Sequence, residues 1–359
     1  MALALVRDLR EQRTPLNEDE LAAFETDVLA EFVLARASAG LADSTIRNDA
    51  GHLESMREWF GRPLWEMQPT DADAYFGREL RTVAQSTRTG RAGALTLYFD
   101  FLELRHRAEI YNLTGQPVQC PLDEANRPRR SVEPQLRIPP TEAEIEQLFA
   151  GWRDQLAGTR KFAPAARNYT VARLGADVGL RINELRMLDL DDVHWELGTF
   201  GKLNARHGKG SRRRGPKPRL VPLINGADRT LTWFVQEVWA VFGDDHTRPG
   251  APLFPSERHG HDGLAGRPTT DVFRRALAAA VATHLPSWAG SLTPHVLRHY
   301  CASQLYAAGM DLLAVQELLG HAWITTTMRY VHIHRTRIEQ SWQHSQQRAA
   351  DRWKGLKPR

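Results

Sequence analysis

Apolar residues recur at helical spacing through the first third of the chain. Between residues 18 and 37, six of them would share one face of a long helix: Leu21, Phe24, Val28, Leu29, Phe32 and Val33. Three more helices are predicted, with amino-terminal caps at Ser44, Thr70 and Ser86, the last running to about Leu104. Residues 15–107 are therefore expected to form a helical domain, with a short extension over residues 1–14.

Periodicity stops over residues 108–139, which are rich in proline. This composition predicts an extended linker between two domains. It carries Arg127, Arg129 and Arg130. Exposed arginines in a linker are often only solvated, but a basic linker can also close a clamp around a duplex. The three arginines are candidate DNA contacts only if the domain that follows also binds a duplex.

A second domain begins where Pro139 and Pro140 precede Thr141. Thr141 and Glu144 have capping-box spacing before an apolar run, which predicts a helix start. Helical patterns continue to about residue 190, a strand-like, glycine-interrupted region spans 193–223, and helices follow. The predicted fold class is mainly α with a small β-sheet (α+β). This domain is expected over residues 140–335, with a helical tail over 336–359.

Composition adds a bias toward arginine. The 359 residues carry 47 Lys and Arg against 43 Asp and Glu, and lysine stands at only six positions: Lys161, Lys202, Lys209, Lys217, Lys354 and Lys357. Arginine suits bidentate phosphate contacts, although a GC-rich genome would give the same bias. Cys120 and Cys301 are too few for a disulfide framework or a zinc site. No apolar run is long enough for a signal peptide or a membrane span, so a soluble intracellular protein is expected.

Candidate chemistry starts at Arg181, which follows Gly179-Leu180 among apolar neighbours. A helix is expected to begin there, and an arginine at a helix amino terminus makes an anion site. The alternative is that Arg181 only pairs with Glu184 on the same helix.

A basic run follows between strand-like segments, over residues 207–219. It has no acidic residue and six basic ones: Lys209, Arg212, Arg213, Arg214, Lys217 and Arg219. We expect a β-hairpin whose loop is either solvated or in contact with phosphates. Lys209 lies between two glycines, which allow close approach to a ligand, and its ammonium can donate a proton.

A phosphate-binding helix start is predicted near residue 294. Thr293 is a suitable cap and Pro294 a suitable first helical residue. His295 and Arg298 then lie one turn apart on a single face near the positive end of the helix, while Val296 and Leu297 point into the core. A bound phosphate accounts for the histidine–arginine pair better than a structural role does.

The last segment combines Gly320, His321 and Tyr330. Gly320 ends a helix that begins near Asp311, His321 follows at once, and a short helix would end near Tyr330. A lone tyrosine normally packs in the core or lies on the surface. This segment therefore indicates a function only together with the three segments described before it.

Together these segments resemble the tyrosine recombinase (phage integrase) family in residue type, order and spacing. The resemblance spans roughly residues 140–335 and implies a catalytic set: Arg181, Lys209, His295, Arg298, His321 and Tyr330. The helical region over 15–107 is similar in size and position to the family's core-binding (SAM-like) DNA-binding domain. The resemblance implies a site-specific DNA recombinase that acts in integration, excision or transposition.

The family's chemistry implies a role for each residue. Tyr330 would attack the phosphodiester and form a 3′-phosphotyrosyl link, and Lys209 would protonate the departing 5′-oxygen, with Lys217 as the competing candidate. Both arginines would clamp the nonbridging oxygens. His295 would move a proton to or from Tyr330, and His321 would donate to the phosphorus centre. Glu184 would support Arg181 or His295.

The implied partners are a double-stranded recombination site and further copies of the chain, two per site and four in the synapse. No metal or cofactor is expected, and the location would be cytoplasmic, in a bacterium, at the nucleoid. The tail could dock on its own domain or on the next protomer. Two other functions remain open: a type IB topoisomerase and a non-catalytic DNA-binding protein on the same scaffold.

Overall fold

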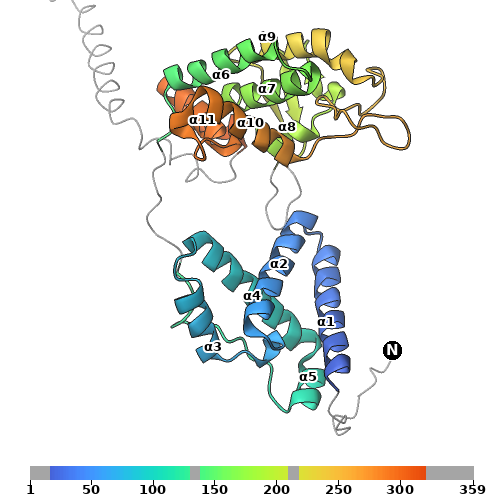
Figure 1. Ribbon diagram of the computed structural model, residues 1–359, viewed down its shortest axis with the longest axis vertical. Coiled ribbons are helices and arrows are strands. Elements are labelled where there is room, and N and C mark those ends of the chain that lie inside the picture. The colour runs from blue at the N-terminus through green and yellow to red at the C-terminus, as the bar shows by residue number, and fades with distance from the viewer. Residues whose placement is uncertain (1–16, 130–137, 209–217, 321–359) are drawn as a thin grey trace, which may run out of the picture. The chain divides into compact units, whose positions relative to one another are not determined.

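A computed structural model describes residues 17–129, 138–208 and 218–320. The chain divides into two compact units, Met1–Pro134 and Gln135–Arg359 (Figure 1). Within the described ranges, no helix combines the length and apolar character that crossing a bilayer requires.

The first unit is helical, as the periodicity predicts. It consists of α1 (Glu18–Ser38), α2 (Asp43–Phe60), η1 (Leu64–Glu66), α3 (Pro69–Ala74), the π-helical turn η2 (Tyr75–Glu79), α4 (Gln85–Arg105) and α5 (Arg107–Thr114). Helix α2 contacts both α1 and α4. Leu53 and Met56 from α2 and Leu95 and Leu102 from α4 are almost completely buried, so the α2–α4 contact forms the middle of this core.

The predicted caps of the second, third and fourth helices are wrong. Helix α2 has Ala42 at its N-cap and α4 has Ala84, and neither helix has a side-chain cap. Helix α3 begins at Pro69, and the Gln68 backbone N–H donates to Asp71. Each helix starts one residue before the hydroxyl residue that the sequence suggested, because the change in backbone conformation, and not the hydroxyl, sets the boundary.

The predicted linker is shorter than residues 108–139. Helix α5 runs through Thr114, and Ile110, Val118 and Leu122 are buried against the helical core. Val118 and Leu122 lie beyond the end of α5 and in no helix or strand, so their burial is not part of a periodic pattern that the sequence could reveal. The segment to about residue 122 therefore belongs to the first unit.

The second unit is built around α7. Its helices are α6 (Glu142–Leu156), α7 (Phe162–Asp177), α8 (Ile182–Met187), η3 (Leu190–Asp192), α9 (Ala227–Trp233), η4 (Phe234–Val238), η5 (Trp239–Phe242), α10 (Thr270–His284), η6 (Pro286–Trp288), α11 (Pro294–Ala307) and α12 (Leu312–Leu319). Helix α7 contacts α6, α9, α10 and α11 (Figure 1), and most of its residues are buried. The capping box at Thr141 is confirmed: its N–H donates to Glu144 Oε2 at 2.7 Å, and its hydroxyl accepts from the Glu144 N–H at 3.3 Å.

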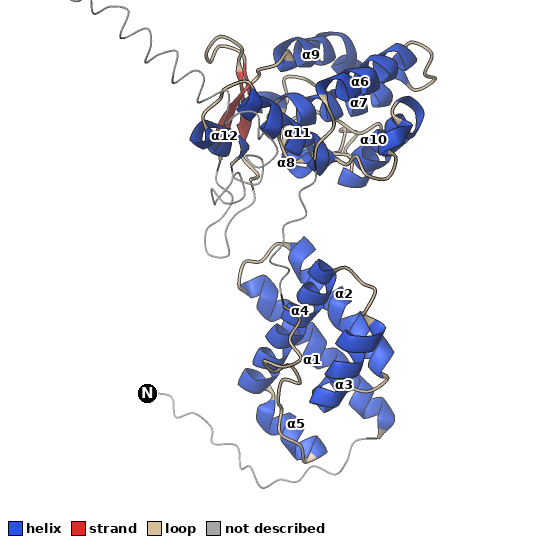
Figure 2. Ribbon diagram, turned by 90° about the vertical axis from the view of Figure 1, so that its left-hand side faces the viewer, coloured by secondary structure: helices blue, strands red, loops and turns tan. Residues whose placement is uncertain are grey.

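A small antiparallel sheet completes the second unit and confirms the predicted fold class. Its strands are β1 (Val193–His194), β2 (Lys202–Ala205) and β3 (Arg219–Pro222), in the order β1-β2-β3. Leu203 pairs with Val221 and Ala205 with Arg219. The predicted hairpin is therefore present, and β3 contacts α12 (Figure 2).

Candidate active site

The turn before α8 is shaped by Gly179. Its φ of +68° is accessible to glycine at little cost, and a Cβ there would lie 2.6 Å from Leu319 Cδ2. The chain then enters α8 with Arg181 at the N-cap position, so the predicted helix start is confirmed.

Glu184 fixes the arginine at this turn. Its carboxylate accepts hydrogen bonds from the Arg181 backbone N–H and from Arg181 Nη1, each at 2.8 Å. Glu184 is 1% exposed, whereas the Arg181 side chain is 28% exposed. The pairing with Glu184 and a role in anion binding are therefore compatible: one guanidinium nitrogen is occupied, and part of the side chain still faces solvent.

Arg219 also binds both oxygens of the Glu184 carboxylate. Its Nη2 donates to Glu184 Oε2 at 2.9 Å, its Nη1 to Oε1 at 3.1 Å, and its Nε to the Leu318 carbonyl at 2.9 Å. Only 11% of the side chain is exposed. All three guanidinium nitrogens of Arg219 therefore bind within the domain, which differs from the expectation that Arg219 projects from the hairpin to contact DNA.

Arg298, which lies on α11, is the third arginine close to the Glu184 carboxylate. The Thr293 hydroxyl accepts from the Val296 N–H, which confirms the predicted cap, and Val296 and Leu297 are buried as expected. Arg298 is 1% exposed and donates from Nη1 to the Gly179 carbonyl at 2.7 Å and from Nη2 to the Leu319 carbonyl at 2.6 Å. Its Nη1 also lies 3.8 Å from Glu184 Oε2.

His295 is exposed at the first turn of α11, unlike Arg298 one turn further on. Its Nε2 lies 3.0 Å from Nε2 of His299, and the two rings meet edge to face. One ring must donate and the other accept across that contact, so His299 influences the proton of His295. His299 is not among the residues predicted from the sequence, although its spacing of four residues from His295 places the two on one face of α11.

The four residues Arg181, Glu184, Arg219 and Arg298, which we call the Glu184 cluster, carry three guanidinium groups around one carboxylate. Burial alone would raise the pKa of Glu184, but hydrogen bonds from Arg219 and Arg181 hold that pKa below its ordinary value. Glu184 is therefore ionised at neutral pH, and these four groups have two positive charges in excess. Such an excess favours a bound anion.

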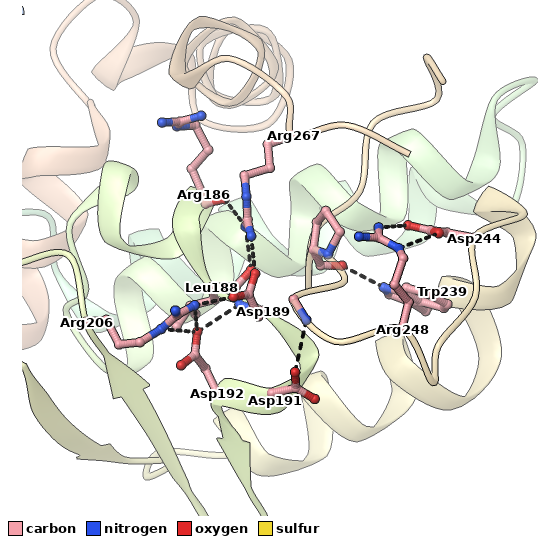
Figure 3. Close-up of polar contacts among 12 residues, drawn as sticks. Arg186, Leu188, Asp189, Asp191, Asp192, Arg206, Trp239, Asp244, Arg248 and Arg267 are labelled. Atoms are coloured by element: carbon pink, nitrogen blue, oxygen red, sulfur yellow. Dashed lines mark hydrogen bonds and ion pairs between the residues drawn. The ribbon is translucent and has the colours of Figure 1, made fainter. Parts of the chain in front are cut away.

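A second cluster lies at the start of the same hairpin and differs in its charge. Arg206, which follows β2, donates to Asp192 at 2.7 Å and also to Asp189 (Figure 3). Arg267 donates to Asp189 and, at 2.8 Å, to the Leu188 carbonyl. We call Asp189, Asp192, Arg206 and Arg267 the Asp189 cluster; its charges balance.

Eight of the predicted site residues lie outside the described ranges, and so does the predicted tail over 336–359: the eight are Arg130, Lys209, Arg212, Arg213, Arg214, Lys217, His321 and Tyr330. Gly320, directly before His321, ends α12 in a left-handed conformation, as predicted. Arg127 and Arg129 are exposed in the first unit, and the Gln85 side chain donates to the Arg129 carbonyl. Both remain candidate DNA contacts.

The place of Arg219 was open to prediction from strand alternation. Side chains alternate across a strand, so Arg219 shares the face of Val221, which is buried, while Leu220 between them is exposed. The count of basic residues in the run concealed this signal.

The described residues contain no group of three or more His, Cys, Asp or Glu side chains placed to hold a metal ion.

Comparisons with known proteins agree with this arrangement. The model of the phage integrase family matches residues 141–337. The tyrosine recombinase XerD of Rhizobium meliloti is 29% identical over 322 residues, which cover 87% of this chain and 94% of that protein. The XerD of Oceanobacillus iheyensis is 34% identical over 191 residues, covering 52% of this chain and 56% of the relative.

Solved structures share the fold. The site-specific recombinase XerH, bound to palindromic difH substrate in a post-cleavage complex, gives a TM-score of 0.57 at 21% identity and covers 82% of this chain and 78% of its own. A lambda integrase dimer bound to a COC′ core site gives 0.57 at 16% identity and covers 85% and 94%. The family match spans more than half of the chain and contains the Glu184 cluster, so the chain belongs to the phage integrase (tyrosine recombinase) family.

Proposed function

We propose that this chain is a site-specific DNA recombinase that cleaves and rejoins strands through a covalent 3′-phosphotyrosyl link to Tyr330. The observation that carries the proposal is the Glu184 cluster, with its two excess positive charges and the partly exposed guanidinium of Arg181. A phosphodiester repels nucleophiles because it is anionic, and its transition state concentrates charge on the nonbridging oxygens. Preorganised arginines offset that charge.

In the proposed cleavage step the phenolic oxygen of Tyr330 attacks phosphorus, and the bond from phosphorus to the 5′-oxygen breaks. His295 takes the phenolic proton, and Lys209 supplies a proton to the leaving 5′-oxygen. Arg181 and Arg298 hold the nonbridging oxygens, and His321 donates a further hydrogen bond to one of these oxygens. The 5′-hydroxyl of a partner strand reverses the step, so the phosphotyrosyl bond conserves the energy and no ATP is consumed.

The functions of related proteins support the same assignment. The relatives named above are tyrosine recombinases, and the XerH structure holds a site-specific recombinase on its substrate. We propose that this chain acts on a double-stranded site, as a dimer on each site and a tetramer in the synapse. Its place would be the bacterial cytoplasm, at the nucleoid.

Capture of the covalent adduct tests the proposal. Cells that produce the full chain are lysed in denaturant, and the DNA that remains attached to the protein is sequenced. Wild type is expected to retain DNA with one shared sequence, and Tyr330→Phe, which lacks a single oxygen, is expected to retain none.

The other outcomes of this experiment are equally informative. If wild type retains no DNA, the chain only binds DNA and the proposal is wrong. Adducts scattered over many sequences, together with relaxation of supercoiled plasmid, would instead identify a topoisomerase.

A further inference from the structure

We infer that Arg219 is a positioning residue that ties the phosphate-binding turn at Arg181 to the end of α12, from which the segment carrying His321 and Tyr330 departs. This inference rests on the proposed function, because it concerns how the parts of that site are held in register. It also replaces the initial expectation that Arg219 contacts DNA.

The first part of the connection runs through Glu184. Arg219 binds both carboxylate oxygens, at 2.9 and 3.1 Å, and the same two oxygens receive the backbone N–H and the side chain of Arg181 at 2.8 Å. A carboxylate held at four points has little freedom to rotate. The direction of the Arg181 side chain is therefore fixed through Glu184 by a strand that is distant in sequence.

The second part runs to α12. Arg219 Nε donates to the Leu318 carbonyl at 2.9 Å, and Arg298 Nη2 donates to the Leu319 carbonyl at 2.6 Å. The last carbonyls of a helix lack intrahelical partners and carry partial negative charge, so two guanidinium groups satisfy and stabilise them. Two consecutive carbonyls of the final turn are thus fixed by two members of the Glu184 cluster.

Gly320 shows how closely Arg219 approaches this helix end. A Cβ at position 320 would lie 2.9 Å from Arg219 Nη1 and 3.0 Å from its Cζ. The guanidinium therefore packs against the backbone of the residue that directly precedes His321. One planar side chain contacts the anion site on one side and the start of the nucleophile-bearing segment on the other.

The charged groups that face Glu184 come from three places. Arg181 lies at the start of α8, Arg219 on β3 and Arg298 on α11. Of the interactions that lower the pKa of Glu184, the hydrogen bond from Arg219 is the largest, while burial acts in the opposite direction. Loss of Arg219 removes the largest of these interactions, so the pKa of Glu184 should rise and the carboxylate should take up a proton at a higher pH than in wild type.

The test compares Arg219→Gln with Arg206→Gln in the full chain. Both arginines flank the same hairpin and bind buried carboxylates, but Arg206 serves the Asp189 cluster. The substrate is a nicked duplex carrying the sequence recovered from wild-type adducts. Single-turnover adduct formation is measured from mildly acidic to mildly alkaline pH, and thermal unfolding identifies any variant that fails to fold.

We expect Arg219→Gln to form adduct about 10²-fold more slowly at neutral pH, because displacement of reacting groups by about 1 Å has that effect. Its rate should fall further as the pH drops, with the acidic limb at higher pH than in wild type. Arg219→Lys, which keeps the charge beside Glu184, should move the acidic limb back toward wild type, and Arg206→Gln should follow the wild-type profile.

Measurements of DNA affinity distinguish a positioning role of Arg219 from a direct contact between Arg219 and DNA. In a Tyr330→Phe background, Arg219→Gln should leave the affinity and its salt dependence unchanged. Loss of a phosphate contact would instead lower the slope of log K against log salt by about one. A normal rate with such a change in slope would overturn the inference, as would a folded Arg219→Gln with the wild-type rate and profile. Absence of adduct in wild type itself would contradict the proposed function instead.

Discussion

The two arginine clusters of the second unit are close in sequence and built from the same parts, yet their charges differ. In the Asp189 cluster two arginines meet two carboxylates (Figure 3), and in the Glu184 cluster three arginines surround one. Each cluster joins a residue at one end of the β2–β3 hairpin to a buried acid. Only the balanced cluster is electrostatically complete by itself.

We propose that this difference in charge separates a structural site from a binding site. Burial of charge is costly, and a balanced, hydrogen-bonded group recovers that cost internally. The Asp189 cluster holds the hairpin to the segment around Leu188 and needs nothing further. The four residues of the Glu184 cluster carry two more positive than negative charges, and the side chain of Arg181 is partly exposed, which fits the phosphate site that we propose. Arginine content alone could not have distinguished the two.

The largest expected effect comes from removal of the shared acid. Glu184→Gln leaves three guanidinium groups around a neutral side chain that is buried. Removal of one partner from a buried ion pair costs about 3–5 kcal/mol of unfolding free energy. Denaturant unfolding should show that loss, and adduct formation by the folded fraction should fall by about 10²-fold or more because Arg181 loses its support.

Asp189→Asn is the matched control for that variant. It should also lose several kcal/mol of unfolding free energy, since Arg206 and Arg267 both bind Asp189. Its folded fraction should nevertheless form adduct at the wild-type rate. Equal loss of cleavage in both variants would abolish the distinction between the clusters.

The second-largest effect should change the rate of adduct formation while leaving the free energy of unfolding almost unchanged. Arg181→Ala should slow adduct formation by about 10²–10³-fold, the usual consequence of losing one preorganised donor to a transition-state oxyanion. Its unfolding free energy should change by less than about 1 kcal/mol, because the side chain is partly exposed and belongs to a cluster with excess positive charge.

Arg206→Ala should behave in the opposite way, with lower stability and an unchanged cleavage rate, because it leaves Asp189 and Asp192 without one of their cations. Single-turnover kinetics and urea unfolding on the same preparations provide both values. If Arg181→Ala were as fast as wild type, the Glu184 cluster could not be the site of phosphate chemistry.

The sequence predicted the second unit better than the first. Thr141, Thr293 and Gly320 lie at helix ends where one side chain or one backbone conformation decides the boundary, and all three predictions are confirmed. In the first unit the backbone alone sets the starts of α2 and α4, so Ser44 and Ser86 gave misleading signals. A capping residue predicts a helix boundary from the sequence only where the cap itself determines that boundary.

Within the site, residue types were predictable but contacts were not. Arg181 and Glu184 are three residues apart, so their pairing could be expected from helix geometry. Arg219 lies 35 residues from Glu184 and 99 from Leu318, and its contacts depend on how β3 packs against α8 and α12. Contacts between residues so distant in sequence depend on tertiary packing, and the spacing of residues along the chain does not predict them.

The smallest expected effect tests the excess charge directly, without DNA. Inorganic phosphate at ten times its Kd should stabilise wild type by about 1.4 kcal/mol, since a ligand that binds only the folded state stabilises by RT ln(1 + [L]/Kd). Thermal unfolding would show this as a rise of a few degrees in Tm, with chloride at matched ionic strength as the reference. Phosphate also stabilises proteins in general through its exclusion from their surface, so the variants decide the matter. Arg181→Ala should lose the specific part of the rise, and Arg206→Ala, with its Glu184 cluster intact, should keep it. An equal rise in all three proteins would mean that neither cluster binds the anion, and that the two differ in charge but not in function.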